Sequence, residues 1–123
     1  MDGAQLSFFD AFDPVAIRRP VDPDGPVIPQ SEIDETLFLP HPKLAWHRAE
    51  IELHQHVDGT WMWSASFNAG DRGYSYQVGP KWGRFAASRD DALRLAVKEI
   101  EGRLTGCSDS AAVAVLKWAR ALT

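Results

Sequence analysis

The stretch "AEIELHQHVDGTWMWSASF" (residues 49–67) is the part of this sequence that indicates the fold most clearly. Apolar and polar residues alternate along both 49–56 and 60–67, as they do in half-buried β-strands. Between the two runs lies Asp58-Gly59, a dipeptide typical of two-residue hairpin turns. The sequence therefore predicts an antiparallel hairpin. Its buried face would carry Ala49, Ile51, Leu53, Trp61, Trp63, Ala65 and Phe67.

Two shorter segments after the hairpin extend the predicted sheet. "YSYQV" (74–78) alternates again and predicts a third strand. "GPKWGRFAA" (79–87) begins with a turn and leaves room for a short fourth strand between Trp82 and Phe85. We expect three or four antiparallel strands in total.

The apolar period then changes from that of a strand to that of a helix. "SRDDALRLAVKEIEGRL" (88–104) places its apolar residues on one stripe behind a capping serine, Ser88. "SDSAAVAVLKWARALT" (108–123) predicts a second helix, capped by Ser108 or Ser110. The predicted class is α+β: an antiparallel three- to four-stranded sheet followed by two helices packed on one face.

The part of the chain before the hairpin has a different composition. Residues 1–48 hold seven of the eight prolines, and "RRPVDPDGPVIPQ" (18–30) should be extended or turn-like because proline fixes φ. "SEIDETLFLP" (31–40) could begin a short helix, but a brief turn that docks Leu37, Phe38 and Leu39 on the body fits better. We predict an extended proline-rich arm over 1–48 and a compact domain over 49–123.

Length, composition and charge limit the classes of function. The chain has 123 residues, enough for one domain, and no apolar run of about 18 residues that could span a membrane. No signal peptide is visible, and Cys107 as the lone cysteine excludes an internal disulfide and any multi-cysteine zinc site, so a cytoplasmic location is predicted. Residues 1–48 carry eight acids against four bases, whereas 49–123 carry nine of each, so the net charge does not favour binding to polyanions.

Two clusters suggest alternative sites on the predicted domain. His54 and His56 lie two residues apart on one strand face with Asp58 beyond them, which could form the metal site of a hydrolase, or could be an ordinary solvated face. The aromatic side chains could stack unpaired bases beside a basic loop patch, although we favour Trp61, Trp63, Tyr74 and Tyr76 as the core under the helices. The residues of this candidate nucleic-acid surface are Arg72, Lys81, Trp82, Arg84 and Arg89.

Two sequence resemblances concern the body of the chain. "KWGRF" (81–85), followed by a helical segment, resembles the WGR nucleic-acid-binding domain. The predicted order of strands and helix is similar to that of HicB-type antitoxins and double-stranded-RNA-binding domains. These likenesses would imply a small sheet-plus-helix module, but a shared fold does not specify a function.

The pentapeptide "QLSFF" (5–9) closely resembles the bacterial sliding-clamp-binding motif, Gln-Leu-Ser/Asp-Leu-Phe. The resemblance implies that Gln5 binds a polar pocket of the clamp while Leu6 and Phe9 enter its apolar groove. Phe8 stands where the motif usually has leucine. Alternatively, the apolar residues of this segment, with Phe12, pack back on the protein's own body.

The function predicted from the sequence is therefore macromolecular binding rather than catalysis. Neither a GxSxG elbow nor a Walker loop occurs, and no cofactor is expected. We predict a non-enzymatic protein of a bacterium or mobile element that acts as an adaptor or inhibitor of a protein or nucleoprotein complex. The target would be a sliding clamp or, in the manner of an anti-CRISPR protein, a defence complex. Nucleic-acid binding and metal-dependent hydrolysis are the alternatives.

Overall fold

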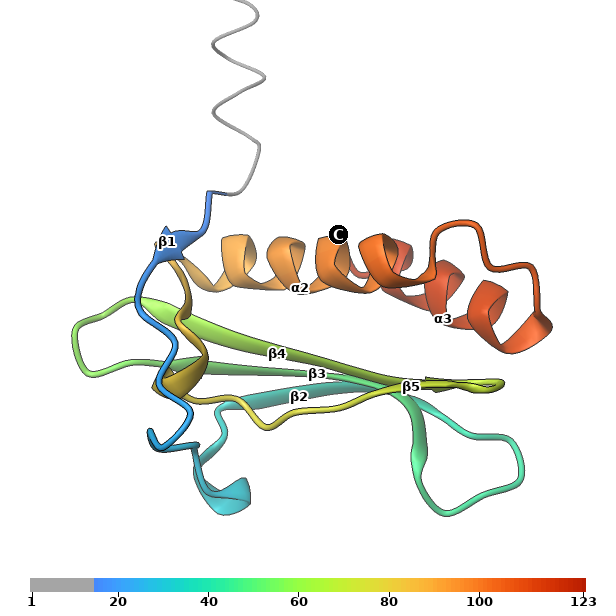
Figure 1. Cartoon of the computed structure of the whole chain (residues 1–123), viewed down its shortest axis with the longest axis horizontal. Helices are drawn as coiled ribbons and strands as arrows, with labels where there is room; N and C mark the ends of the chain where they lie inside the picture. Colours follow the sequence, from blue (N-terminus) through green and yellow to red (C-terminus); the bar gives the residue numbers. More distant parts are fainter. Residues whose placement is uncertain (1–14) are drawn as a thin grey trace, which may run out of the picture.

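A computed structural model describes residues 15–123 of the chain and has an antiparallel sheet with two helices on one face (Figure 1). The strand order is β1-β6-β4-β3-β2, and β5 pairs with the end of β4. The strands are β1 (Ile17–Arg18), β2 (Glu35–Pro40), β3 (His47–Gln55), β4 (Trp61–Ala69), β5 (Arg72–Tyr74) and β6 (Arg84–Ala86). The helices are η1 (Gln30–Glu32), η2 (Pro80–Trp82), α2 (Arg89–Leu104) and α3 (Ser110–Ala121). The predicted α+β class is confirmed. Neither α2 nor α3 is long and apolar enough to cross a membrane.

The predicted hairpin is formed by β3 and β4 and lies inside the sheet, between β6 and β2. Leu53 pairs with Trp63 and Ile51 with Ala65, so their side chains share one face. The turn closes with a hydrogen bond from the His56 amide to the Thr60 carbonyl at 2.7 Å. Gly59 takes φ +89°, a left-handed conformation that explains the glycine in this turn.

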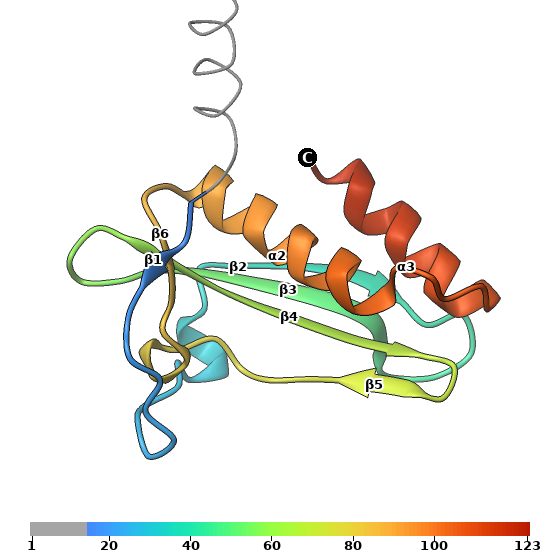
Figure 2. The same cartoon turned by 45° about the horizontal axis from the view of Figure 1, so that its top comes forward.

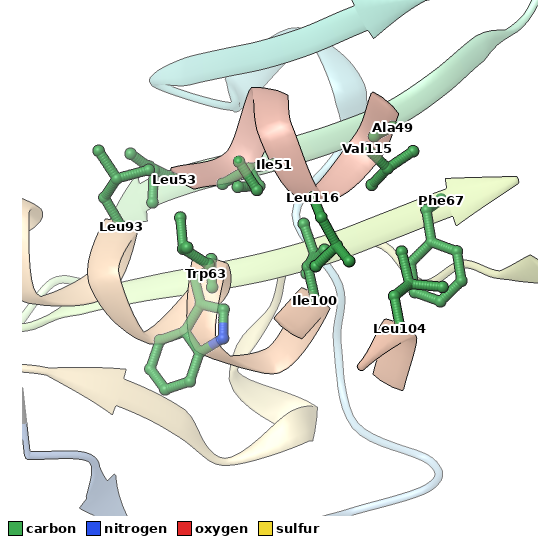
Figure 3. Close-up of a cluster of buried hydrophobic side chains, with 14 of the residues drawn as sticks. Ala49, Ile51, Leu53, Trp63, Phe67, Leu93, Ile100, Leu104, Val115 and Leu116 are labelled. Carbon is green, nitrogen blue, oxygen red and sulfur yellow. The ribbon is translucent and has the colours of Figure 1, made fainter. Parts of the chain in front are cut away.

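The core lies between this hairpin and the helices, which cross it on the same side (Figures 1 and 2). Figure 3 shows Leu53 of β3 beside Leu93 of α2, and Ile100 of α2 beside Leu116 of α3. Trp63 is 5% exposed and belongs to this core, whereas three other aromatic residues of the predicted core are half-buried at its margin. They are Trp61, Tyr74 and Tyr76.

Two local predictions need correction. The third strand was expected over 74–78, but β5 ends at Tyr74. The Ser66 hydroxyl lies 3.3 Å from both the amide nitrogen and the carbonyl oxygen of Tyr76. These side-chain hydrogen bonds take the place of further backbone hydrogen bonds between β4 and β5. The N-cap of α3 is Asp109, not Ser108 or Ser110. Its carboxylate accepts a hydrogen bond from the Ala112 amide at 3.2 Å, and its charge suits the positive end of the helix dipole.

The proline-rich segment is part of the sheet. Residues 35–40, expected as a brief turn, form β2, which pairs with β3 so that Leu37 and Leu39 pack on the core. The boundary predicted between residues 48 and 49 therefore falls inside β3 and separates most of this strand from its partner β2. Further back, Ile28 donates its amide to the Val78 carbonyl at 2.8 Å. This contact belongs to a second apolar cluster on the helix-free face, made by Ile17, Ile28, Ile33, Met62, Val78 and Phe85.

Candidate protein-binding surface

Three large apolar side chains are exposed at one end of the sheet. Phe38 of β2 is 48% exposed, and Leu44 and Trp46 of the following loop are 45% and 54% exposed. Figure 1 shows this loop below the sheet, on the side away from the helices. We call these three residues the 38–46 patch. Its exposure is notable because a folded domain ordinarily buries side chains of this size, and apolar groups gathered on a surface indicate a contact site.

A register shift between β2 and β3 shapes the patch. Leu39 pairs with Ala49 but Pro40 pairs with His47, so β3 carries one extra residue here, as in a β-bulge. The shift brings the His47 ring onto the same face as Phe38, where the two rings stack with centroids 4.2 Å apart. The loop itself is held by the His41 Nδ1 atom, which accepts hydrogen bonds from the backbone amides of Lys43 and Leu44, each at 3.0 Å.

A groove of about 450 Å³ runs from the 38–46 patch across the helix-free face of the sheet. Trp46 and His47 line it on one side and Ser75 on the other, with Glu50 and Ser66 between them. Glu50, Ser66 and Ser75 also line an adjoining hollow of about 220 Å³. The two spaces therefore meet at the Glu50 side chain.

The groove and the adjoining hollow are acidic, with Glu50 lining both and Glu52 lining the hollow. Glu52, 5% exposed, accepts hydrogen bonds at Oε1 from the Ser64 hydroxyl (2.9 Å) and the Val78 amide (3.0 Å). Burial raises the pKa of Glu50 and the neighbouring Glu52 carboxylate raises it further, while His47 acts in the opposite direction. This site therefore holds a partly desolvated carboxylate beside a buried one, which favours a positively charged ligand.

Each of the three predicted metal ligands contacts a different partner elsewhere in the fold. His54 Nδ1 lies 3.2 Å from Asp34 Oδ2, and the His56 ring meets the edge of Phe85 at 5.3 Å. Asp58 accepts hydrogen bonds from Thr60 and forms an ion pair with Arg19 at 2.8 Å. These contacts hold the pKa of the Asp58 carboxyl well below its usual range. Within residues 15–123 no three histidine, cysteine, aspartate or glutamate side chains converge so as to hold a metal ion.

The basic residues of the candidate nucleic-acid surface do not gather in one patch. Arg72 pairs across from Ala69 at one end of β4, whereas β6, which carries Arg84, pairs with the other end. Arg84 binds Glu99 at 2.9 Å, and Arg89 binds both oxygens of Glu35 at 2.8 Å.

The aromatic and lysine members of that surface contact one another instead. Lys81 lies 4.7 Å over the ring of Trp82, whose indole N–H donates to the Gln77 carbonyl at 2.8 Å. These contacts within the protein do not add support to the prediction that the two residues bind nucleic acid.

Glu99 of α2 is a residue that the sequence interpretation missed. Its carboxylate accepts hydrogen bonds from the Tyr76 hydroxyl (2.9 Å), Arg84 Nε (2.9 Å) and the Trp63 indole (3.3 Å). Burial and the Glu99 charge together raise the pKa of Tyr76, so its hydroxyl stays protonated and donates. The signal was a charged residue three positions after Ala96, on the edge of the apolar stripe of the helix.

The 38–46 patch was also missed as a site, because Trp46 lies in a segment interpreted as an arm. The four predicted clamp-binding residues, Gln5, Leu6, Phe8 and Phe9, lie outside the described residues. Comparison of the chain with protein-family models, curated proteins and solved structures gives no match.

Proposed function

We propose that this protein is a non-enzymatic adaptor or inhibitor that binds other proteins through two separate surfaces. One is the 38–46 patch on the folded body. The other is the QLSFF peptide at 5–9. The observation that supports the proposal is the exposure of Phe38, Leu44 and Trp46 at one end of the sheet, where Trp46 also lines a groove, because aromatic anchors next to a concavity are typical of protein interfaces.

The order of the proline-rich segment supports a rigid binding body. Asp22 donates its amide to the Lys81 carbonyl at 2.8 Å, and the Lys81 amide donates in turn to Pro26. The Arg19 guanidinium lies 3.8 Å over the Phe85 ring. These contacts fix residues 17–33 on the body. Phe38 lies in the β2–β3 pair, and His41 holds the loop that carries Leu44 and Trp46, so little entropy is lost when the patch is covered.

The peptide suggests the first target to test. A clamp-binding motif works as a short segment that supplies a few anchors, and QLSFF matches its glutamine, its first leucine and its last phenylalanine. The same architecture would suit an inhibitor of a defence complex. A cytoplasmic location, where Cys107 stays reduced, is part of this proposal.

A binding assay on an immobilised, purified bacterial sliding clamp tests the peptide surface. The full chain should bind, and Gln5→Ala/Leu6→Ala/Phe9→Ala should bind at least about 100-fold more weakly, because losing the hot-spot anchors together costs about 3 kcal/mol or more. Phe8→Leu restores the usual leucine of the motif and should bind more tightly than the unmodified chain.

Trp46→Ala is the matched control, since it changes the other surface and should leave clamp binding unchanged. Equal binding by the triple variant and the unmodified chain, or no binding of either, would contradict the clamp as target.

A further inference from the structure

We infer that the groove beside the 38–46 patch holds an arginine side chain of a protein partner. The inference rests on the proposed function and names what the body of the protein recognises. Three features carry it: an exposed aromatic wall of the groove, carboxylates of the groove (Glu50) and of the adjoining hollow (Glu52) with unused capacity to accept hydrogen bonds, and a negative charge that disfavours the chain's own acidic N-terminal segment.

The aromatic wall is Trp46. The residue is 54% exposed, and it lines a groove of about 450 Å³. The neighbouring His47 ring is already stacked on Phe38, so the indole is the face left for a ligand at this end. A guanidinium plane stacks on an indole face more favourably than on any other side chain.

Glu50 lines the same groove, and Glu52 lines the adjoining hollow of about 220 Å³ that meets the groove at Glu50. Both hydrogen bonds to Glu52 end on Oε1, so within residues 15–123 nothing donates to Oε2, although the residue is 5% exposed. No described residue donates to either oxygen of Glu50, whose pKa is raised by burial and by Glu52. A guanidinium would supply several donors in one plane and cancel part of the charge repulsion between the two carboxylates.

The charge of the site argues against two other occupants. The first fourteen residues contain Asp2, Asp10 and Asp13 but no lysine or arginine, so they would meet Glu50 with like charge. A bound metal would need a third ligand, and no such group of three occurs in the described part of the chain. A cationic side chain from another protein fits the charge of the groove.

The test is an NMR titration of the ¹⁵N-labelled full chain with acetyl-Ala-Arg-Ala-amide. The matched probe replaces arginine with citrulline, which keeps the shape and loses the charge. The arginine peptide should shift the amide signals of Glu50, Ser66 and Ser75 and the indole signal of Trp46, and the citrulline peptide should not. Glu50→Gln should weaken binding about tenfold, because a hydrogen bond to a charged group is lost.

Glu32→Gln is the control variant, since Glu32 is an exposed glutamate outside the groove and its loss should leave the titration unchanged. Equal shifts from the arginine and citrulline peptides, tighter binding of a lysine peptide, or no shift in the groove would each overturn the inference. Failure here would leave the clamp assay and the patch untouched, so the proposed function and the arginine assignment fail separately.

Discussion

Replacing Glu99 with alanine is expected to lower the free energy of unfolding by about 2–4 kcal/mol. The carboxylate is the common acceptor for Tyr76, Arg84 and Trp63, and its side chain is only 14% exposed. Without it, a guanidinium, a hydroxyl and an indole N–H lose their acceptor in a place that water reaches poorly. Equilibrium urea unfolding followed by tryptophan fluorescence measures the loss.

Glu101→Ala is the matched control on the same helix. Glu101 binds Arg120 at 2.8 Å, but the arginine side chain is 59% exposed, and an ion pair of this kind contributes about 0–1 kcal/mol. If both substitutions cost the same, the Glu99 network does not hold the 74–84 segment to α2 as the contacts imply.

The second large effect is expected from Gly83→Ala. Gly83 has φ +68°, which costs an alanine about 1–2 kcal/mol. In addition, the new Cβ would fall on the Arg19 carbonyl oxygen and lie 3.1 Å from its carbonyl carbon. Because neither backbone can retreat without breaking the β1–β6 pair, we expect a total loss of about 3 kcal/mol or more. Hydrogen exchange should show that the amides of β1 and β6 lose protection first.

Gly59→Ala separates the two contributions. Gly59 has φ +89°, but no atom lies within 4 Å of the Cβ that alanine would add. It should therefore show the backbone cost alone, without faster exchange in β1. An equal loss at both glycines would mean that residues 17–22 are not packed on the body as described.

The parts of the fold that local pattern could predict are those whose partners are close in sequence. The β3–β4 hairpin follows from alternation and Asp58-Gly59, and α2 follows from its stripe and from Ser88, whose hydroxyl accepts the Asp91 amide at 3.1 Å. β2 was missed because Pro40 and its neighbours suggest a linker, while its strand character comes from pairing with β3 across the 41–46 loop.

The candidate site was harder to predict, because several histidine, aspartate and arginine side chains that suggested a site form contacts that stabilise the fold. His54 and Asp58 contact Asp34 and Arg19, and Arg84 is held by Glu99. Conversely, Trp46 has no motif around it, and only the bulge and loop reveal that it is exposed beside an acidic groove. Spacing alone could not show which charged and aromatic side chains remain available to a partner.

The most direct test of the central claim, that this protein works by contact through its body, is site-specific photocrosslinking in bacterial cells. A photoreactive phenylalanine analogue replaces Trp46 in one variant and Val57, 97% exposed at the far hairpin turn, in the other. We expect a discrete covalent adduct with a partner protein from position 46 and none from position 57. The same adducts at both positions, or none at position 46, would contradict that claim.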